Sequence, residues 1–165
     1  MNISELKEFL DEKAAHYNHP RFVETDPIQI PHRFSRKENI EIAGLLTATI
    51  AWGNRQSIIK NASRFMTLLE NQPFQFITEA SERELKMASD FTHRTFNHAD
   101  TLFFLQSLRH IYGNRGGLEA VFSEGFRQEG SVWSALKNFR TVFLETGGPL
   151  RTRKHLPDVT AGSAA

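Results

Sequence analysis

Apolar residues recur at spacings of three and four along almost the whole chain, and this period limits the fold more than any other feature. The first such stripe consists of Ile3, Leu6, Phe9 and Leu10. Residues Ile42 to Trp52 are apolar almost all round, which predicts a helix buried on several sides. Only the stretches QIPHRF and FTHRTF hint at extended structure, and neither shows a long alternation of apolar and polar residues. The sequence therefore predicts an all-α fold, a bundle of about seven or eight helices.

Capping signals predict where two of these helices begin. Ser35 is followed three residues later by Glu38, and Ser81 by Glu84, and each pair has the pattern of a capping box. Between two of the apolar helices stands the stretch WGNRQ, in which glycine and asparagine break the helical spacing. We therefore expect two helices to meet at a polar turn there.

The length of 165 residues fits one domain with a sizeable core, to which the 14 phenylalanines should contribute much. Within this domain, residues 18–34 contain three prolines and predict an extended connector, because a residue before proline avoids the helical region. Residues 147–165 predict a basic loop followed by a partial hairpin. We thus expect a single domain over residues 1–165.

Composition excludes several classes of protein. The chain has no cysteine, which excludes disulfides, thiol nucleophiles and cysteine-based zinc sites. Its N-terminus, MNISELKEFLDEK, is charged from the start and does not resemble a signal peptide, and no apolar run is long enough to cross a bilayer. We expect a soluble cytoplasmic protein without a cofactor. The net charge of +1 favours neither a nucleic-acid partner nor its absence.

Histidine and carboxylate patterns give no strong sign of catalysis. His16 and His19 have a spacing that could share a metal, but no HExxH motif is present, and surface or capping roles are favoured. The carboxylate pairs are not coupled to a recognisable nucleophile, and nucleotide-binding glycine motifs are missing. A small-molecule enzyme that uses His93, Arg94 and His98 rests only on the clustering of these residues. We therefore predict no metal site and no catalytic residue.

The turn WGNRQ is the first candidate binding site. It places Asn54, Arg55 and Gln56 at a helix N-terminus, where free amides and the helix dipole favour an anion. Arginine and glutamine can also bond to base edges of DNA. The alternative is a plain polar turn with Trp52 packed in the core, and for the turn taken alone this alternative is favoured.

The C-terminal stretch RTRKHLPDVTAGSAA is the second candidate. Its basic run, which suits phosphates, consists of Arg151, Arg153, Lys154 and His155. The small residues Gly162, Ser163 and Ala164 allow close backbone approach, and a helix that began there would direct its amides at the same phosphates. The alternative is a disordered terminus.

Two stretches together carry a resemblance to known proteins. EIAGLLTATIAWGNRQSIIKNASRFM resembles the early helix pair of helix-hairpin-helix DNA glycosylases, and LPDVTAGSA resembles their hairpin, with Asp158 and Thr160 in place of both hairpin glycines. Over essentially the whole chain, the sequence resembles an uncharacterised bacterial family, Domain of Unknown Function 2400. Its recognisable pieces also include YNHPRFVETDPIQIPHRF, FTHRTF and RKHLPDVTAGSAA. Members of that family continue further, so the resemblance implies an N-terminal fragment.

The resemblance implies a fold like the N-terminal part of a helix-hairpin-helix glycosylase, truncated at the hairpin, whose partner is double-stranded DNA. The residues expected to face DNA are Asn54, Arg55, Gln56, Arg151, Arg153, Lys154 and His155, with His32 and Arg33 as weaker candidates. The catalytic aspartate and lysine of the glycosylases have no counterpart here, so we expect a non-catalytic chain. The alternative is a helical protein-interaction or structural domain without a nucleic-acid role.

A truncated hairpin has a consequence for packing. It would leave the apolar faces of Leu136, Phe139 and Phe143 uncovered. From this we expect low stability or self-association of the chain.

Overall fold

The structure is a computed structural model, and it describes residues 2–156 and 158–161. Over these residues the fold is all-α, as predicted, with one isolated bridge between His93 and Phe96 and no longer strand. The helices are α1 (Ile3–Tyr17), α2 (Pro20–Thr25), α3 (Lys37–Thr49), α4 (Arg55–Leu68), α5 (Pro73–Glu79), α6 (Glu82–Ala88), α7 (His98–Asn114), α8 (Leu118–Glu129) and α9 (Val132–Phe143). The 3-10 turns are η1 (Pro27–Gln29), η2 (Pro31–Arg33), η3 (Leu144–Thr146), η4 (Leu150–His155) and η5 (Val159–Ala161). None of the described helices is long and apolar enough to cross a membrane.

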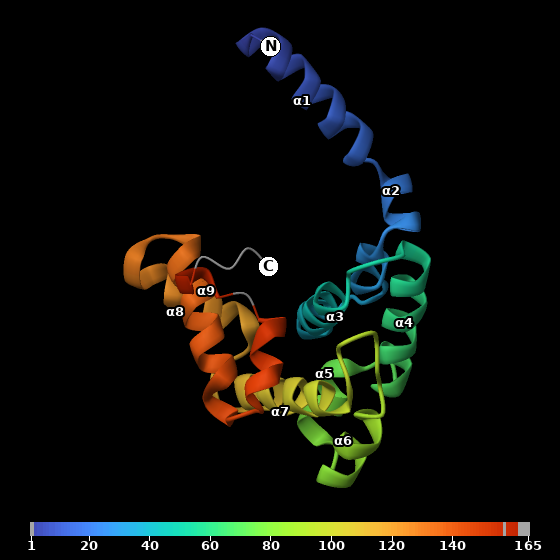
Figure 1. Cartoon of the computed structure of the whole chain (residues 1–165), viewed down its shortest axis with the longest axis vertical. Helices are drawn as coiled ribbons and strands as arrows, with labels where there is room; N and C mark the ends of the chain where they lie inside the picture. The colour runs from blue at the N-terminus through green and yellow to red at the C-terminus, as the bar shows by residue number, and fades with distance from the viewer. Residues whose placement is uncertain (1, 157, 162–165) are drawn as a thin grey trace.

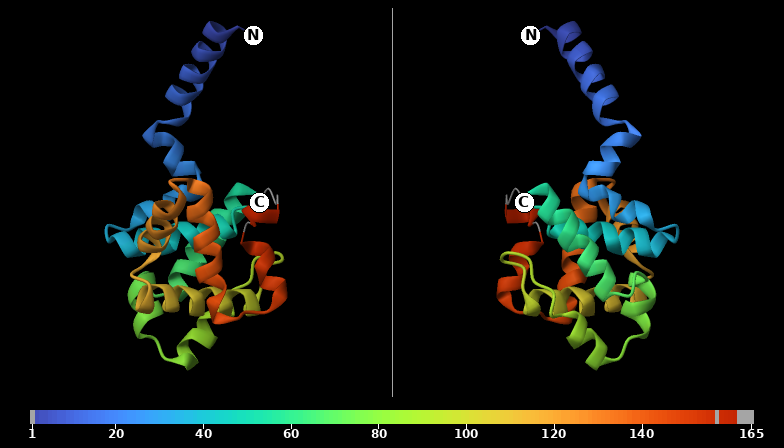
Figure 2. Two further views of the ribbon diagram at one scale, coloured as in Figure 1. Left: turned by 90° about the vertical axis from the view of Figure 1, so that its left-hand side faces the viewer. Right: turned by 90° about the vertical axis from the view of Figure 1, so that its right-hand side faces the viewer.

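Helix α7 contacts α5, α6, α8 and α9, and it runs across the lower part of the body in Figure 1. Phenylalanine rings fill much of the core, as predicted. The Phe104 ring lies 5.2 Å from that of Phe96 and 4.8 Å from that of Phe143, so α7 joins the loop before it to α9. Helix α1 behaves differently, because it projects away from the body in all views (Figures 1 and 2) and has no buried residue.

One of the two predicted capping boxes forms. Ser81 Oγ accepts a hydrogen bond from the Glu84 amide at 3.3 Å, and the Glu84 carboxylate accepts one from the Ser81 amide at 2.7 Å. The box predicted at Ser35 is wrong, because α3 begins one residue later, with Arg36 as its N-cap. The Glu38 carboxylate pairs instead with the Arg36 side chain at 2.9 Å. A charged hydrogen bond to the neighbouring arginine thus replaces the bond to the backbone.

The prediction of an extended connector over residues 18–34 is wrong as well. The segment forms α2, η1 and η2, and each of its three prolines stands at the first position of one of these turns. Proline suits that position because its fixed φ is helical and its missing N–H needs no partner there. The residues before Pro20 and Pro27 are extended, as the proline rule requires, and their side chains cap the turns that follow.

The predicted uncovered face on α9 is also wrong. Phe139 and Phe143 are buried, and Leu136 is half-buried. The Phe139 ring stacks on Phe122 of α8 at 4.8 Å, and α7 covers Phe143. The hairpin residues Pro157 and 162–165 lie outside the described part of the chain, so the predicted hairpin is not tested.

Candidate nucleic-acid interface

The turn between α3 and α4 holds the first group of predicted DNA-facing residues. Asn54 is the N-cap of α4, and its Oδ1 accepts a hydrogen bond from the Ser57 amide at 3.1 Å. Its side chain therefore has a structural role. Arg55 and Gln56 follow in the first turn of α4, and both are exposed. The Arg55 guanidinium lies 3.8 Å from the Asp26 carboxylate, too far for a firm hydrogen bond.

A loop from a distant part of the sequence meets this turn. Residues 91–97 form most of the connection between α6 and α7, and His93 and Phe96 exchange two backbone hydrogen bonds that fold this loop into a tight turn. Arg94, at the tip, has a φ of 55°, and its guanidinium lies against Gly53. A Cβ atom at Gly53 would stand 2.7 Å from the Arg94 guanidinium carbon, so only glycine allows this approach. The same guanidinium lies 5.6 Å from the centre of the Trp52 ring.

Trp52 is therefore not a core residue, as the alternative interpretation of the turn supposed. It is 37% exposed and stands at the surface beside Arg94. The ring of His93 lies beneath it, 6.5 Å away edge-on. Burial, together with the neighbouring Arg94 charge, lowers the pKa of His93 below its ordinary value.

The basic run near the C-terminus is anchored to the same loop. Arg151 donates a hydrogen bond to the Thr95 carbonyl at 3.2 Å, and its guanidinium lies 3.3 Å from the buried Asp100 carboxylate. His155 also approaches Asp100, at 3.5 Å. The loop 91–97 thus brings together two groups of residues that stand about a hundred positions apart in the sequence.

His155 is not available to DNA, so this prediction needs correction. Its side chain is 6% exposed and its ring packs edge-on against Phe96 at 5.1 Å. Burial lowers its pKa, and the nearby Asp100 carboxylate only partly offsets this effect. Arg153 and Lys154 point to solvent from the same turn, while the Arg153 carbonyl accepts a hydrogen bond from Arg140 at 3.3 Å.

The weaker candidates and the enzyme alternative gain little from the structure. Arg33 donates to Ser63 at 3.0 Å and to Gln29 at 3.1 Å, which ties it to α4 and η1. The Nδ1 atom of His98 lies 2.9 Å from the Ser89 hydroxyl, whereas His93 faces Trp52. The two histidines therefore contact different residues and do not share a site. The described residues contain no group of three or more side chains that could hold a metal ion.

We define the arginine strip as Arg55, Arg94 and Arg151 together with the exposed Trp52, which contacts Arg94. Sequence reasoning found Arg55 and Arg151 but assigned Arg94 to another hypothesis and placed Trp52 in the core. The signal that could have linked them is Gly53, which leaves room for a large side chain beside the tryptophan.

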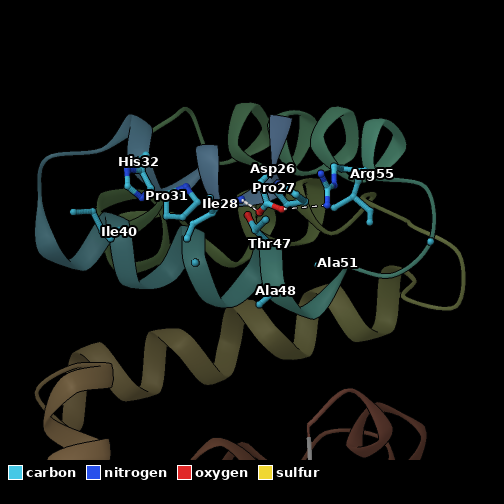
Figure 3. Close-up of a pocket in the computed structure, with 13 residues that line it drawn as sticks. Asp26, Pro27, Ile28, Pro31, His32, Ile40, Thr47, Ala48, Ala51 and Arg55 are labelled. Carbon is cyan, nitrogen blue, oxygen red and sulfur yellow. Dashed lines mark hydrogen bonds and ion pairs between the residues drawn. The ribbon is translucent and has the colours of Figure 1, made fainter. Parts of the chain in front are cut away.

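An apolar groove borders the strip (Figure 3). It is a cavity of about 690 Å³ between η1 and η2 on one side and α3 and the start of α4 on the other. Its polar lining residues are Asp26, His32, Thr47 and Arg55, and the remaining lining is apolar or glycine. The Thr47 hydroxyl is buried there and has no hydrogen-bond partner among the residues that the structure describes. The groove can therefore take an apolar ligand or side chains of a partner.

These features define a helical domain with an arginine strip, which includes an exposed tryptophan, and an apolar groove beside it. The chain belongs to the family described as Protein of unknown function (DUF2400), whose model matches residues 26–165. Helices α1 and α2 lie outside this match. Comparisons with curated proteins and with solved structures give no match.

Proposed function

We propose that this domain binds double-stranded DNA through the arginine strip and has no catalytic role of its own. The observation that carries the proposal is the position of loop 91–97 between the two predicted basic groups. Its Arg94 lies against Trp52 and Gly53, which directly precede the first group, and its Thr95 carbonyl accepts a hydrogen bond from Arg151 of the second group. Guanidinium groups pair with phosphates, and an aromatic face can stack on a base, so the combination suits nucleic acid.

The resemblance of the turn to that of helix-hairpin-helix DNA glycosylases supports the same proposal. It suggests a role like that of a base-excision-repair protein in a bacterial cytoplasm, with DNA contacts also from Gln56, Arg153 and Lys154. Asn54 and His155 would act indirectly, by capping α4 and by packing the loop that carries Arg94. We assign no residue a place in a bond-breaking step.

A protein-interaction domain is the second candidate, and the carboxylates beside the strip favour it. Asp26 partly neutralises Arg55, and Asp100 partly neutralises Arg151, so the two arginines carry less free charge than the sequence suggests. Arg94 has no carboxylate partner among the described ion pairs, and it therefore distinguishes the two candidates best.

The test is the salt dependence of binding to a fluorescent duplex, measured by anisotropy for the unchanged chain and for the double variant Arg55→Ala/Arg94→Ala. Each lost phosphate contact should reduce the slope of log K against log salt by about 0.9, so the double variant should lose about 2. Arg127→Ala on α8, an exposed arginine away from the strip, is the matched control and should bind as the unchanged chain does. If the chain does not bind the duplex, or if the double variant keeps the full slope, the proposal is wrong.

A further inference from the structure

Helix α1 presents an apolar face that nothing in the described chain covers. Ile3 is 88% exposed, Leu6 40%, Phe9 47% and Leu10 55%, and they lie on one side of the helix at spacings of three and four. The helix contacts the body only near its C-terminal end, where the Tyr17 ring meets Phe22 edge-on at 5.8 Å. An isolated helix of 15 residues is marginally stable in water, so this face gains from a partner.

The apolar groove beside the strip is a second unfilled surface, and it lies on the other side of α2 from α1. Ile28 and Ile40 stand at its rim and are 45% and 40% exposed. Pro27, Pro31 and Ala48 add flat apolar walls. A groove of this kind can hold an amphipathic helix through side chains spaced like those of α1.

We propose that α1 of one copy of this chain docks in the apolar groove of a second copy, and that the exchange is reciprocal. In a two-fold dimer each copy must offer both the inserted helix and the groove that receives it, and this chain has both. Its own α1 does not fill its own groove, because no residue of α1 is buried. The groove shares Arg55 with the proposed DNA contact, but the docking of α1 does not depend on DNA binding.

Charge favours this occupant. Helix α1 carries four carboxylates against two lysines, so its flanks are acidic. The groove has Arg55 at one end and His32 at the other, and its single carboxylate, Asp26, already faces Arg55. The acidic flanks of α1 can thus meet Arg55 at one end of the groove, which favours one orientation of the helix more than it adds affinity.

The size of the contact favours an exchange in both directions. A helix of 15 residues is about 22 Å long and 10 Å wide, so one side of it covers roughly 220 Å² of a partner. A single helix in a single groove is far below the size of a stable interface, and a second helix in the second groove doubles the contact.

The experiment measures the mass of the chain by sedimentation equilibrium over a range of concentrations. The unchanged chain should be a dimer at micromolar concentration. The helix variant Leu6→Glu/Leu10→Glu and the groove variant Ile28→Glu/Ile40→Glu should each weaken dimerisation by more than about 100-fold, because each buries charges in an apolar contact. Met87→Glu, which changes an exposed apolar residue on α6, is the matched control and should leave the dimer intact. Circular dichroism checks that every variant keeps its helical content.

Mixing the two defective variants gives the sharper result. One intact helix and one intact groove remain in the mixture, so a heterodimer should form that is weaker than the original dimer but absent from either variant alone. A monomeric unchanged chain overturns the proposal. So does a groove variant that still forms a full dimer, because α1 would then pair with another α1 or with a different surface.

Discussion

At the scale of single residues, the buried group around Asp100 is what holds the C-terminal turn to the body. Asp100 is fully buried, caps α7 by accepting a hydrogen bond from the Asn97 amide at 2.9 Å, and faces both Arg151 and His155. A buried carboxylate is costly unless it is paired, so Arg151 contributes to folding as well as to the proposed DNA contact. A substitution of Arg151 should therefore change the stability of the fold as well as DNA binding. Arg55 and Arg94 do not pair with Asp100, so their substitution tests DNA binding more directly.

The two buried histidines give the fold a dependence on pH. Burial is the main cause that lowers the pKa of both His93 and His155, so each is harder to protonate in the folded state than in the unfolded chain. The unfolded state then binds more protons between the lowered pKa and the ordinary value of about 6.5. The stability contributed by the neutral histidines is present above that value and is lost as the pH falls.

We therefore expect the free energy of unfolding, measured in urea, to decrease as the pH is lowered from 7.5 to 5.5. In the His155→Gln variant this free energy should decrease less. His93 is unchanged in this variant, so part of the decrease should persist. His32→Gln, at an exposed position, is the control and should follow the unchanged chain. An equal decrease in the His155→Gln variant would mean that this side chain is as easily protonated in the fold as in the unfolded chain.

At the scale of elements, the helices were predictable because their spacing is local, whereas the connector over residues 18–34 was not. Pro27 and Pro31 signal an interruption of a long helix, but the same residues also suit the first position of a short turn. Which outcome occurs depends on packing, and Ile30 and Pro31 are buried against the rest of the fold. Likewise, the capping box at Ser35 failed because Arg36 competes for the Glu38 carboxylate.

Two helical glycines, one packed and one open, allow a matched prediction. Gly125 of α8 lies at the contact between α8 and α9. A Cβ atom at Gly125 would stand 2.7 Å from the Ser134 carbonyl oxygen and 2.8 Å from the Ala135 Cα, so Gly125→Ala should destabilise the fold by about 1–3 kcal/mol. Gly113, near the end of α7, has no neighbour within 4 Å of such an atom, and Gly113→Ala should stabilise by about 0.5–1 kcal/mol. Urea unfolding of both variants measures the two effects. A stabilised Gly125→Ala variant would show that the helices can separate without cost.

At the scale of the whole molecule, the arginine strip could not be assembled from the sequence. Arg55 and Arg151 each stand out as part of a local pattern, but the link between their surroundings depends on loop 91–97. Arg94 of this loop lies against Gly53, two residues before Arg55, and the Thr95 carbonyl accepts a hydrogen bond from Arg151. The exposure of the apolar face of α1 could not be predicted either, because the spacing of its apolar residues is that of any helix that packs on a core. The apolar surface expected to remain open on α9 is covered, and the open surface lies at the other end of the chain.

If copies of the chain exchange α1, thermal stability must depend on protein concentration, because a dimer unfolds to two chains and mass action favours the folded state at high concentration. We therefore expect the Tm of the unchanged chain to rise by a few degrees over a hundredfold increase in concentration. Leu6→Glu/Leu10→Glu should remove this rise, and Arg94→Ala, which leaves both α1 and the apolar groove unchanged, should keep it. A Tm that is independent of concentration in all three proteins would mean that α1 finds no partner in a second copy. The reason for its exposed apolar face would then lie with a different protein.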